Sequence, residues 1–514
     1  MRKQQHHTST ILEHGKKYTS EPRPAYWYNY KNHTIITPDG TTGKFSSMQL
    51  SSILSGIEKR MGGVKSVNLF LCAGTLLKNK PPKQYFDVSD GWVREKFEFV
   101  KTIRVTYRRN GFTVHLYGTS KWFGEETDVQ AIRKAYYEVQ SQLDDKFGYP
   151  NLKLYETPAS TGRNLLRVSL PRDVQYERLP DDILSAVYRY CCHQGRIESF
   201  LPSQNVLEDG VYIIDGAWMY ASVLSNLPTG PCEYDTRNEI DTSCPGFYYV
   251  TATVPGDWHH IGLLKEWTNE YSSDEEANYP HTPCETFESW TTGDELVLAI
   301  AHGWQITIHE RYIFPHLLPD PFEAWYRKIK DLRKRASLKG DKLLKAAYRN
   351  IVLHTIGSFK QTYTSKDYTD ITDADYRELE ATGHRIQRFP RRKVGIISCR
   401  DTEVPLSQDM QPFVHPEWAA TVWGRTRARL AEFALQLPYE DIIRLATDCV
   451  WCARKPEWVH DKQVWDEPGE FVLKDYIKGP WSWPINSSEM RSYVMKYNAQ
   501  HNIGDLSLSN DEEE

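Results

Sequence analysis

The sequence of 514 residues lacks the features that mark a secreted or membrane protein. Its nine cysteines are an odd number without regular spacing, and the N-terminal segment MRKQQHHTSTILEHGKKYTSEPR contains no apolar stretch suited to a signal peptide. The longest apolar runs, such as residues 296–301, are far shorter than the roughly 20 residues that cross a bilayer. We therefore expect a reducing, intracellular setting and no membrane role.

The chain also lacks internal repeats and low-complexity segments, apart from the terminal NDEEE. Its formal net charge of −5 argues against a uniformly basic nucleic-acid binder. A content of 40% hydrophobic and 25% charged residues is typical of a soluble globular protein and argues against disorder. The length allows two to four domains.

Basic residues are instead concentrated locally. Between residues 324 and 349 ten Lys or Arg stand against two Asp, and a second cluster contains no acid. The members of this second cluster are Arg385, Arg388, Arg391, Arg392 and Lys393. Such clusters are usually solvated helix faces or loops, and the alternative is contact with phosphate. The 16 Trp and 31 Tyr fit either core packing or stacking on bases.

The hydrophobic patterns predict an α+β chain of several domains. Residues 64–118 form short β-type runs and residues 129–147 have a helical pattern, so we expect an α/β N-terminal domain that ends near residue 180. Further strands are predicted at residues 211–214 and 246–254. Helices are predicted at residues 293–302, 321–336, 341–359 and 417–436.

Two carboxylates stand at the ends of predicted strands. Asp215 follows the apolar run VYII and precedes a glycine, so the carboxylate is expected at a strand end facing a cleft. Asp448 lies between two apolar halves of the segment IIRLATDCVWC, as at the tip of a hairpin. Each alone is more commonly a turn or N-cap residue. Two carboxylates that meet across one sheet would repel unless cations lay between them.

The predicted helix at residues 341–359 carries cations at spacings of three and four. Lys342, Lys345 and Arg349 therefore share one face, which is either a solvated face or a clamp on a triphosphate. Gly357 is suited to end this helix or to let another backbone approach.

Taken in order, these segments resemble the signature of the family B DNA polymerases. The segment from Asp215 to Leu224 resembles the first palm motif D-x-x-S-L-Y-P-S, with Tyr220 at the tyrosine that excludes ribonucleotides. Residues 349–359 resemble the fingers motif K-x-x-x-N-S-x-Y-G-K-F, with Arg349 in the place of the nucleotide-binding lysine. Residues 444–449 resemble the hairpin motif Y-x-D-T-D-S, of which this sequence retains the Thr as Thr447 and the second Asp as Asp448.

Two shorter segments extend the resemblance toward DNA contacts. Gln194, Gly195 and Arg196 resemble the glycine motif that precedes the palm and contacts the template in protein-primed members. Lys474 and Tyr476 have the letters of the K-x-Y motif that supports the primer terminus. We also assign Arg391, Arg392 and Lys393 to DNA binding, because they form a run of cations.

The chain departs from the family pattern at several positions. Trp218 replaces Ser in the first motif, and Leu353 replaces Asn in the fingers motif. Ala446 replaces the first Asp of the hairpin motif, whereas the second Asp, the essential ligand in the family, is kept as Asp448. An acidic D-x-E setting near an early strand, which a proofreading exonuclease would need, is not recognisable.

The resemblance implies a right-hand polymerase, with an antiparallel palm sheet, helical fingers and a small thumb, behind an α/β N-terminal domain. The implied division is residues 1–180 for a degenerate exonuclease-like or accessory domain, 181–320 for the first part of the palm, and 321–400 for fingers and connection. Residues 401–455 would complete the palm with its hairpin and supporting helix, and residues 456–514 would form the thumb and acidic tail.

The implied function is template-directed addition of dNTPs to a 3′ hydroxyl, in the replication of a phage, plasmid or similar element in the cytoplasm of a bacterial or archaeal host. Asp215 and Asp448 would bind two Mg²⁺ ions, for which Mn²⁺ could substitute. Tyr220, Lys342, Lys345, Arg349 and Gly357 would contact the nucleotide. The partners would be template and primer DNA, dNTPs, and a terminal protein or another primer. The alternative is a polymerase-derived DNA-binding protein that has lost catalysis.

Overall fold

The computed structural model describes most of the chain, and the account below is confined to the following residues: 11–15, 23–44, 49–73, 81–98, 103–148, 157–177, 179–180, 183, 187, 191–193, 195–200, 206–267, 278–360, 367–370, 385–389, 392–398 and 411–482.

The N-terminal part is built on a seven-stranded mixed sheet in the order β4-β3-β2-β5-β8-β7-β6. The strands β2, β5 and β8 run parallel, and the others pair antiparallel. The strand bounds are β2 Ala25–Asn29, β3 Thr34–Ile36, β4 Thr42–Lys44, β5 Ser66–Cys72, β6 Val93–Glu98, β7 Arg104–Arg109 and β8 Phe112–Gly118. Short helices accompany them at α1 Leu50–Arg60, η1 Lys83–Phe86 and α2 Ser120–Phe123.

The long helix of this part, α3 (Val129–Phe147), begins and ends where its sequence dictates. Asp128 caps the first turn by accepting the N–H groups of Gln130 and Ala131, and Gly148 ends the helix with φ of 71°. Its buried face packs against the sheet core, where the ring of Trp27 stacks on Phe70 at 4.2 Å. The sequence prediction of a helix at residues 129–147 is confirmed.

A five-stranded antiparallel sheet holds both predicted carboxylates, in the order β10-β20-β21-β12-β22. The strand bounds are β10 Arg196–Ser199, β12 Val211–Gly216, β20 Ile442–Thr447, β21 Cys449–Cys452 and β22 Phe471–Ile477. Its apolar side chains pack on α11 (Pro416–Ala434), and α6 (Met219–Ser222) follows β12 directly. The predicted hairpin at residues 442–452 is thus confirmed as β20 and β21.

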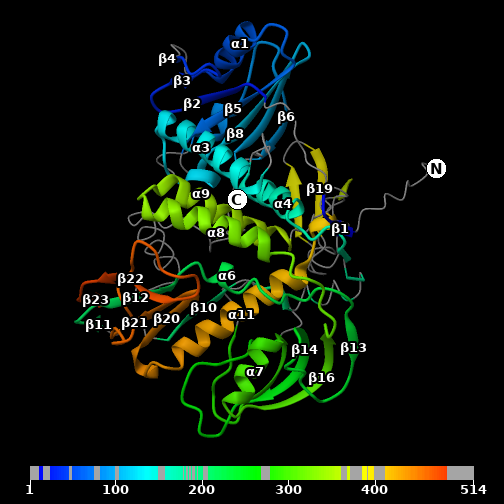
Figure 1. Ribbon diagram of the computed structural model, residues 1–514, viewed down its shortest axis with the longest axis vertical. Helices are drawn as coiled ribbons and strands as arrows, with labels where there is room; N and C mark the ends of the chain where they lie inside the picture. Colours follow the sequence, from blue (N-terminus) through cyan, green and yellow to red (C-terminus); the bar gives the residue numbers. More distant parts are fainter. Residues whose placement is uncertain are drawn as a thin grey trace, which may run out of the picture.

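The helices α8 (Glu323–Leu338) and α9 (Lys342–Ser358) cross the molecule between the seven-stranded and the five-stranded sheet (Figure 1). On one side α9 contacts α2, α3 and α4 (Pro158–Arg167), and on the other side it contacts α6 and α11. Asp341 caps α9 by accepting the N–H of Leu344. This placement brings the cations of α9 over the sheet that carries Asp215 and Asp448.

A four-stranded sheet in the order β13-β16-β14-β15 lies beyond α11 (Figure 1). Its strands are β13 Glu233–Asp235, β14 Gly246–Thr253, β15 Thr286–Thr292 and β16 Gln305–Ile313, and α7 (Gly293–Ala301) follows β15. Glu295 of α7 and Arg427 of α11 form a fully buried ion pair at 2.7 Å. This pair joins the four-stranded sheet to the helix that supports the carboxylate sheet.

The remaining strands form three smaller sheets: β1 (Ile11–Glu13) with β9 (Gln175–Glu177), β11 (Val206–Leu207) with β23 (Trp481–Ser482), and β17 (Asp367–Asp370), β19 (Arg392–Ser398) and β18 (Arg385–Phe389). Two short 3₁₀ helices, η4 (Gln411–Phe413) and η5 (Tyr439–Asp441), flank α11. No helix among the described residues is long and apolar enough to cross a membrane.

The predicted helices and strands of the central region are confirmed, with ends within two residues of the expected positions. The five-part domain division stays a prediction. One boundary of it does not match the sheet: residues 456–482, assigned to the thumb, include β22, which pairs with β12 in the carboxylate sheet.

Candidate functional site

Asp448 lies at the tip of the hairpin that joins β20 and β21. Ala446 pairs with Cys449, so Thr447 and Asp448 alone form the turn. Thr447 has φ of 61°, the positive value that two-residue hairpin turns require. Its hydroxyl lies 3.0 Å from Asp448 Oδ1, to which it can donate. The turn therefore fixes both the backbone and the carboxylate of Asp448.

Asp215 lies beside this tip, near the end of β12. It pairs with Cys449 on one side and with Val472 of β22 on the other. The next residue, Gly216, donates its N–H to the carbonyl oxygen of Asp448 at 2.8 Å. The backbone thus brings together the two carboxylates that the sequence singled out.

The proximity of the two carboxylates changes the acidity of Asp448. Burial and the negative charge of Asp215 raise the pKa of Asp448 to about 6, although Lys474, Thr447 and Arg349 act in the opposite direction. A cation bound between the two carboxylates would stabilise the ionised form of both. The carboxylate oxygens are also the ligands that Mg²⁺ and Mn²⁺ prefer, so the residues present fit these ions.

Lys474 reaches Asp215 from a β-bulge. Ile213 pairs with Asp475 and Ile214 with Leu473, so Lys474 is the extra residue between them. Its Nζ donates to Asp215 Oδ1 at 2.9 Å. Burial opposes the ammonium charge, but Asp215 prevails and raises the pKa of Lys474 above its usual value. The predicted K-x-Y lysine is thus placed at the carboxylates.

Helix α9 contributes two of its three predicted cations to the same place. Burial lowers the pKa of Arg349, whereas Asp448, Asp215 and Tyr220 raise it, which places its guanidinium near all three groups. Burial and the charges of Arg333 and Lys462 lower the pKa of Lys345, which therefore lies among further cations. Tyr220, Lys345 and Arg349 are all partly buried.

The cluster around the carboxylates consists of six predicted residues and three that were not predicted. The predicted members are Asp215, Tyr220, Lys345, Arg349, Asp448 and Lys474, and the others are Arg333, Lys462 and Asp466. Burial and the charge of Arg349 lower the pKa of Arg333 to about 10. The side chain of Asp466 is 5% exposed. Its negative charge raises the pKa of Arg333 and of Lys345, against the effect of burial. Arg333 falls in the basic run at residues 324–349, so composition pointed toward it. Lys462 and Asp466 lie in an irregular segment, where no periodicity could have identified them.

Lys462 and Asp466 belong to the bridging loop, which we define as residues 453–470 between β21 and β22. Its Glu467 forms ion pairs with Lys330 and Lys334 of α8, at 2.8 and 3.1 Å. Its Trp465 and the buried Trp218 both contact the guanidinium of Arg333, at 5.4 and 4.4 Å from their ring centroids. The loop therefore connects α8 to the carboxylate sheet.

Gly195 and Arg196, the described residues of the predicted template motif, are buried. Gly195 packs directly on the hairpin tip, where a Cβ atom would lie 2.7 Å from Thr447 Cα. Arg196 is 1% exposed, pairs with Glu198 and lies 4.1 Å over the ring of Tyr279. This makes Arg196 a packing residue whose guanidinium does not face solvent. Gln194 lies outside the described residues.

Tyr476 lies further along β22 and is 42% exposed. Its ring contacts Tyr212 at 4.7 Å, and its hydroxyl donates to the carbonyl oxygen of Asp209. An open cleft of about 540 Å³ lies beside it, and Arg454, Lys455 and Lys478 also line this cleft. The carboxylate pair is not among the residues that line it. Of the second basic cluster, Arg391 lies outside the described residues, and Arg392 and Lys393 are placed only as backbone of β19.

Two predicted nucleotide-binding residues are not brought into the cluster. Lys342 is exposed at the first residue of α9. Gly357 lies in the last turn of the same helix, and a Cβ atom built on it would meet nothing within 4 Å. The expectation that Gly357 lets another backbone approach is therefore wrong, and the helix ends one residue later, at Ser358.

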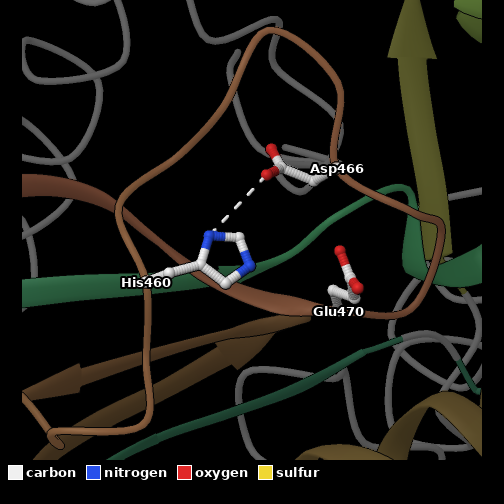
Figure 2. Close-up of side chains that lie close together, drawn as sticks. All are labelled: His460, Asp466 and Glu470. Carbon is white, nitrogen blue, oxygen red and sulfur yellow. Dashed lines mark ion pairs between the residues drawn. The ribbon is translucent and has the colours of Figure 1, made fainter.

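A separate group of polar side chains lies in the bridging loop (Figure 2). One potential ligand atom from each of His460, Asp466 and Glu470 lies within 4.8 Å of the others. Each residue already has a backbone partner: the carbonyl of Asp461, the N–H of Gln463 and the N–H of Glu467, respectively. These contacts hold the loop together, and we assign no metal to the group.

Comparison with known proteins identifies the family of the chain. Residues 126–399, more than half of the chain, match the family described as DNA polymerase type B, organellar and viral. The chain belongs to this family. It is therefore a DNA-directed DNA polymerase, and the resemblance to family B is confirmed. No curated protein matches the sequence of this polymerase.

Solved structures show the same fold at low sequence identity. An orthorhombic crystal form of Phi29 DNA polymerase is 12% identical, with a TM-score of 0.54 over 89% of this chain and 85% of that chain. Phi29 DNA polymerase in complex with primer-template DNA and incoming nucleotide substrates is 10% identical, with the same TM-score and coverage. The complex with single-stranded DNA gives a TM-score of 0.52 at 12% identity. The type B polymerase thus has the mixed α/β, multidomain fold of Phi29 DNA polymerase.

Proposed function

We propose that this polymerase adds dNTPs to a primer 3′ hydroxyl on a DNA template by a two-metal mechanism, with Asp215 and Asp448 as metal ligands. The observation that carries the proposal is the position of the two carboxylates, which the Gly216 to Asp448 hydrogen bond holds together beneath the cations of α9. Two Mg²⁺ or Mn²⁺ ions would activate the 3′ hydroxyl and neutralise the leaving pyrophosphate.

The side chains around the carboxylates have complementary roles in this proposal. Lys345 and Arg349 bind the triphosphate, the latter as a planar fork that can contact two oxygens at once. Tyr220, next to Arg349, excludes the 2′ hydroxyl of a ribonucleotide. Trp218, which replaces the serine of the family motif, stacks on Arg333 and so supports α8. The contacts of Lys342 and Gly357 with the nucleotide stay predictions.

In the same proposal the five-stranded sheet is the palm, with β22 added to it, and α8 with α9 forms the fingers. The primer strand passes Lys474 and Tyr476 toward the cleft lined by Arg454, Lys455 and Lys478. The N-terminal sheet is a degenerate exonuclease-like or accessory domain, and the thumb follows β22. A terminal protein or another primer starts replication of a phage, plasmid or similar element in the cytoplasm of its host.

The proposal is tested by extension of a labelled primer on a DNA template with four dNTPs and Mg²⁺ or Mn²⁺. Asp215→Asn and Asp448→Asn are each expected to lower extension at least about 1000-fold, because neither amide can replace the charge that holds a divalent ion. The control Asp257→Asn, an exposed carboxylate in the loop after β14, should extend like the unaltered protein. DNA binding without extension under any metal would instead indicate a polymerase-derived binding protein.

The nucleotide contacts are tested by steady-state kinetics. Lys345→Met is expected to raise KM for dNTP about tenfold, because it removes a partly buried contact to phosphate. Lys342→Met on the same helix, where the side chain is exposed, should have the smaller effect. Equal effects of the two variants would contradict the placement of the triphosphate beside Lys345.

A further inference from the structure

Lys462 is the one cation of the cluster that neither a motif nor a helix supplies. It belongs to the bridging loop, where its backbone N–H donates to the carbonyl oxygen of Leu473 at 3.0 Å. The preceding residue, Asp461, forms a parallel bridge with the same Leu473. Leu473 immediately precedes Lys474, so the backbone of Lys462 is held beside the bulge that directs Lys474 to Asp215.

The ammonium of Lys462 faces both halves of the site. Desolvation lowers its pKa, Asp215 and Asp466 raise it, and Lys474 and Arg349 lower it. The charge of Lys462 in turn lowers the pKa of Lys345 in α9. The residue as a whole is exposed, so its side chain is not buried beneath the carboxylates.

The described residues offer this ammonium no hydrogen-bond or ion-pair partner. Asp215 is already bonded to Lys474 at 2.9 Å. Asp466 accepts the N–H of Gln463 at 3.1 Å and faces Arg333 and Lys345 as well. Lys462 therefore differs from Lys455 of the same loop, which forms an ion pair with Asp461 at 2.6 Å.

The charges around Lys462 do not balance. Five cations act on one another or on the carboxylates here: Arg333, Lys345, Arg349, Lys462 and Lys474. Four carboxylates oppose them: Asp215, Asp448, Asp466 and Glu470, the last within 4.8 Å of Asp466. The excess of positive charge, increased further by divalent ions, repels itself unless an anion of several charges binds. A nucleoside triphosphate carries such a charge.

We propose that Lys462 binds the triphosphate of the incoming nucleotide from the side of the carboxylate sheet, opposite the contacts made by α9. This role rests on the proposed polymerase function and adds to it a phosphate ligand outside the recognised motifs. The phosphates are then held by two elements, of which α9 supplies Lys345 and Arg349 and the bridging loop supplies Lys462. Because Glu467 ties this loop to α8, Lys462 keeps its position relative to both helices.

The test uses the full chain with Lys462→Met, which removes the charge, and Lys462→Arg, which keeps it. Lys462→Met is expected to raise KM for dNTP at least about tenfold and to change the affinity for primer-template less than about twofold. It should also weaken the binding of inorganic tripolyphosphate, measured by calorimetry in EDTA, by a similar factor. Lys462→Arg should recover most of both losses.

Asp461→Asn is the control for the fold of the loop, because it removes the ion pair of the same loop with Lys455 at a residue to which no binding role is assigned. Equal losses in Asp461→Asn and Lys462→Met would make Lys462 a loop-packing residue and overturn the inference. Unchanged KM and tripolyphosphate affinity in Lys462→Met would overturn it too. Tripolyphosphate binding that depends on Lys462, in a protein that extends no primer, would keep the phosphate site and reject the polymerase mechanism.

Discussion

Lys474 donates to Asp215 across 2.9 Å, and it does so from the extra residue of a β-bulge. The ammonium therefore stands where a divalent ion would compete for the same oxygen. The charge of a lysine in this position opposes a divalent ion that would bind the same carboxylate.

The first prediction concerns this competition. Lys474→Met is expected to bind Mn²⁺ more tightly, by about an order of magnitude in the absence of DNA, because an opposing charge beside Asp215 is removed. Primer extension by the same variant should fall, since the primer contact is lost. Titration of Mn²⁺ by electron paramagnetic resonance measures the first effect, and Lys478→Met, on the cleft beyond the carboxylates, is the control. Weaker Mn²⁺ binding in Lys474→Met would contradict the competition.

The second prediction concerns pH. The pKa of Asp448 is about 6 in the folded protein against a usual 3.8, so the folded state holds this proton more tightly than the unfolded state. The metal-free protein should lose stability as pH rises from about 4 through 6, with a cost on the order of 3 kcal/mol above that window. Asp448→Asn removes the cost.

Urea unfolding in EDTA measures this difference. Asp448→Asn should be more stable than the unaltered protein at pH 8, and equally stable near pH 4, where Asp448 is protonated in both states. Asp441→Asn, whose carboxylate pairs with Arg454 just outside the β20–β21 hairpin, is a useful comparison because it should destabilise at pH 8. A pH-independent difference between Asp448→Asn and the unaltered protein would reject the raised acidity.

The third prediction separates two glycines. Gly195→Ala places a methyl group 2.6 to 2.7 Å from atoms of Thr447, so the hairpin tip must move. We expect a loss of about 1–3 kcal/mol and reduced extension. Gly357→Ala meets no atom and lies in a helix, so it should be neutral or stabilise by up to about 1 kcal/mol. Thermal unfolding of both variants decides the matter, and a Gly357→Ala loss as large as that of Gly195→Ala would contradict it.

The fourth prediction concerns the buried pair of Glu295 and Arg427. Both side chains are at most 4% exposed, and their contacts include Arg427 Nη2 to Glu295 Oε2 at 2.9 Å. Arg427→Met alone is expected to destabilise the protein by about 3–5 kcal/mol, because the carboxylate stays buried without its partner. The double variant with Glu295→Gln should recover part of this loss. Arg425→Met, whose ion pair with Asp294 is more exposed, should cost less.

Much of the fold could be predicted because its elements have local signals. Residues 129–147 carry a helical pattern between an N-cap Asp128 and Gly148, and the hairpin around Asp448 alternates apolar halves with a polar centre. The meeting of Asp215 and Asp448 was predictable from motif order, since each motif fixes its own strand end. Their roles as metal ligands stay a prediction that the experiments above test.

The positions that escaped prediction depend on tertiary contacts. Arg196 lies in a segment that resembles a template-binding motif, but Glu198 and Tyr279, the latter far along the chain, enclose its guanidinium. Gly357 looked like a point of close approach, but its surroundings leave space. Lys462 lies in a segment without helix or strand, and backbone contacts of Asp461 and Lys462 with Leu473 bring it to the site. A local pattern contains none of this information.

The hydrogen bond from the backbone of Gly216 to the backbone of Asp448 has a consequence for how this chain can diverge. This bond joins main-chain groups and does not use the side chain at position 446, although a Cβ atom at position 216 would lie 2.4 Å from Met219 Cε. Ala446 could therefore replace an aspartate without moving the tip of the hairpin. Drift to 10–12% identity with a retained fold is what such an arrangement permits.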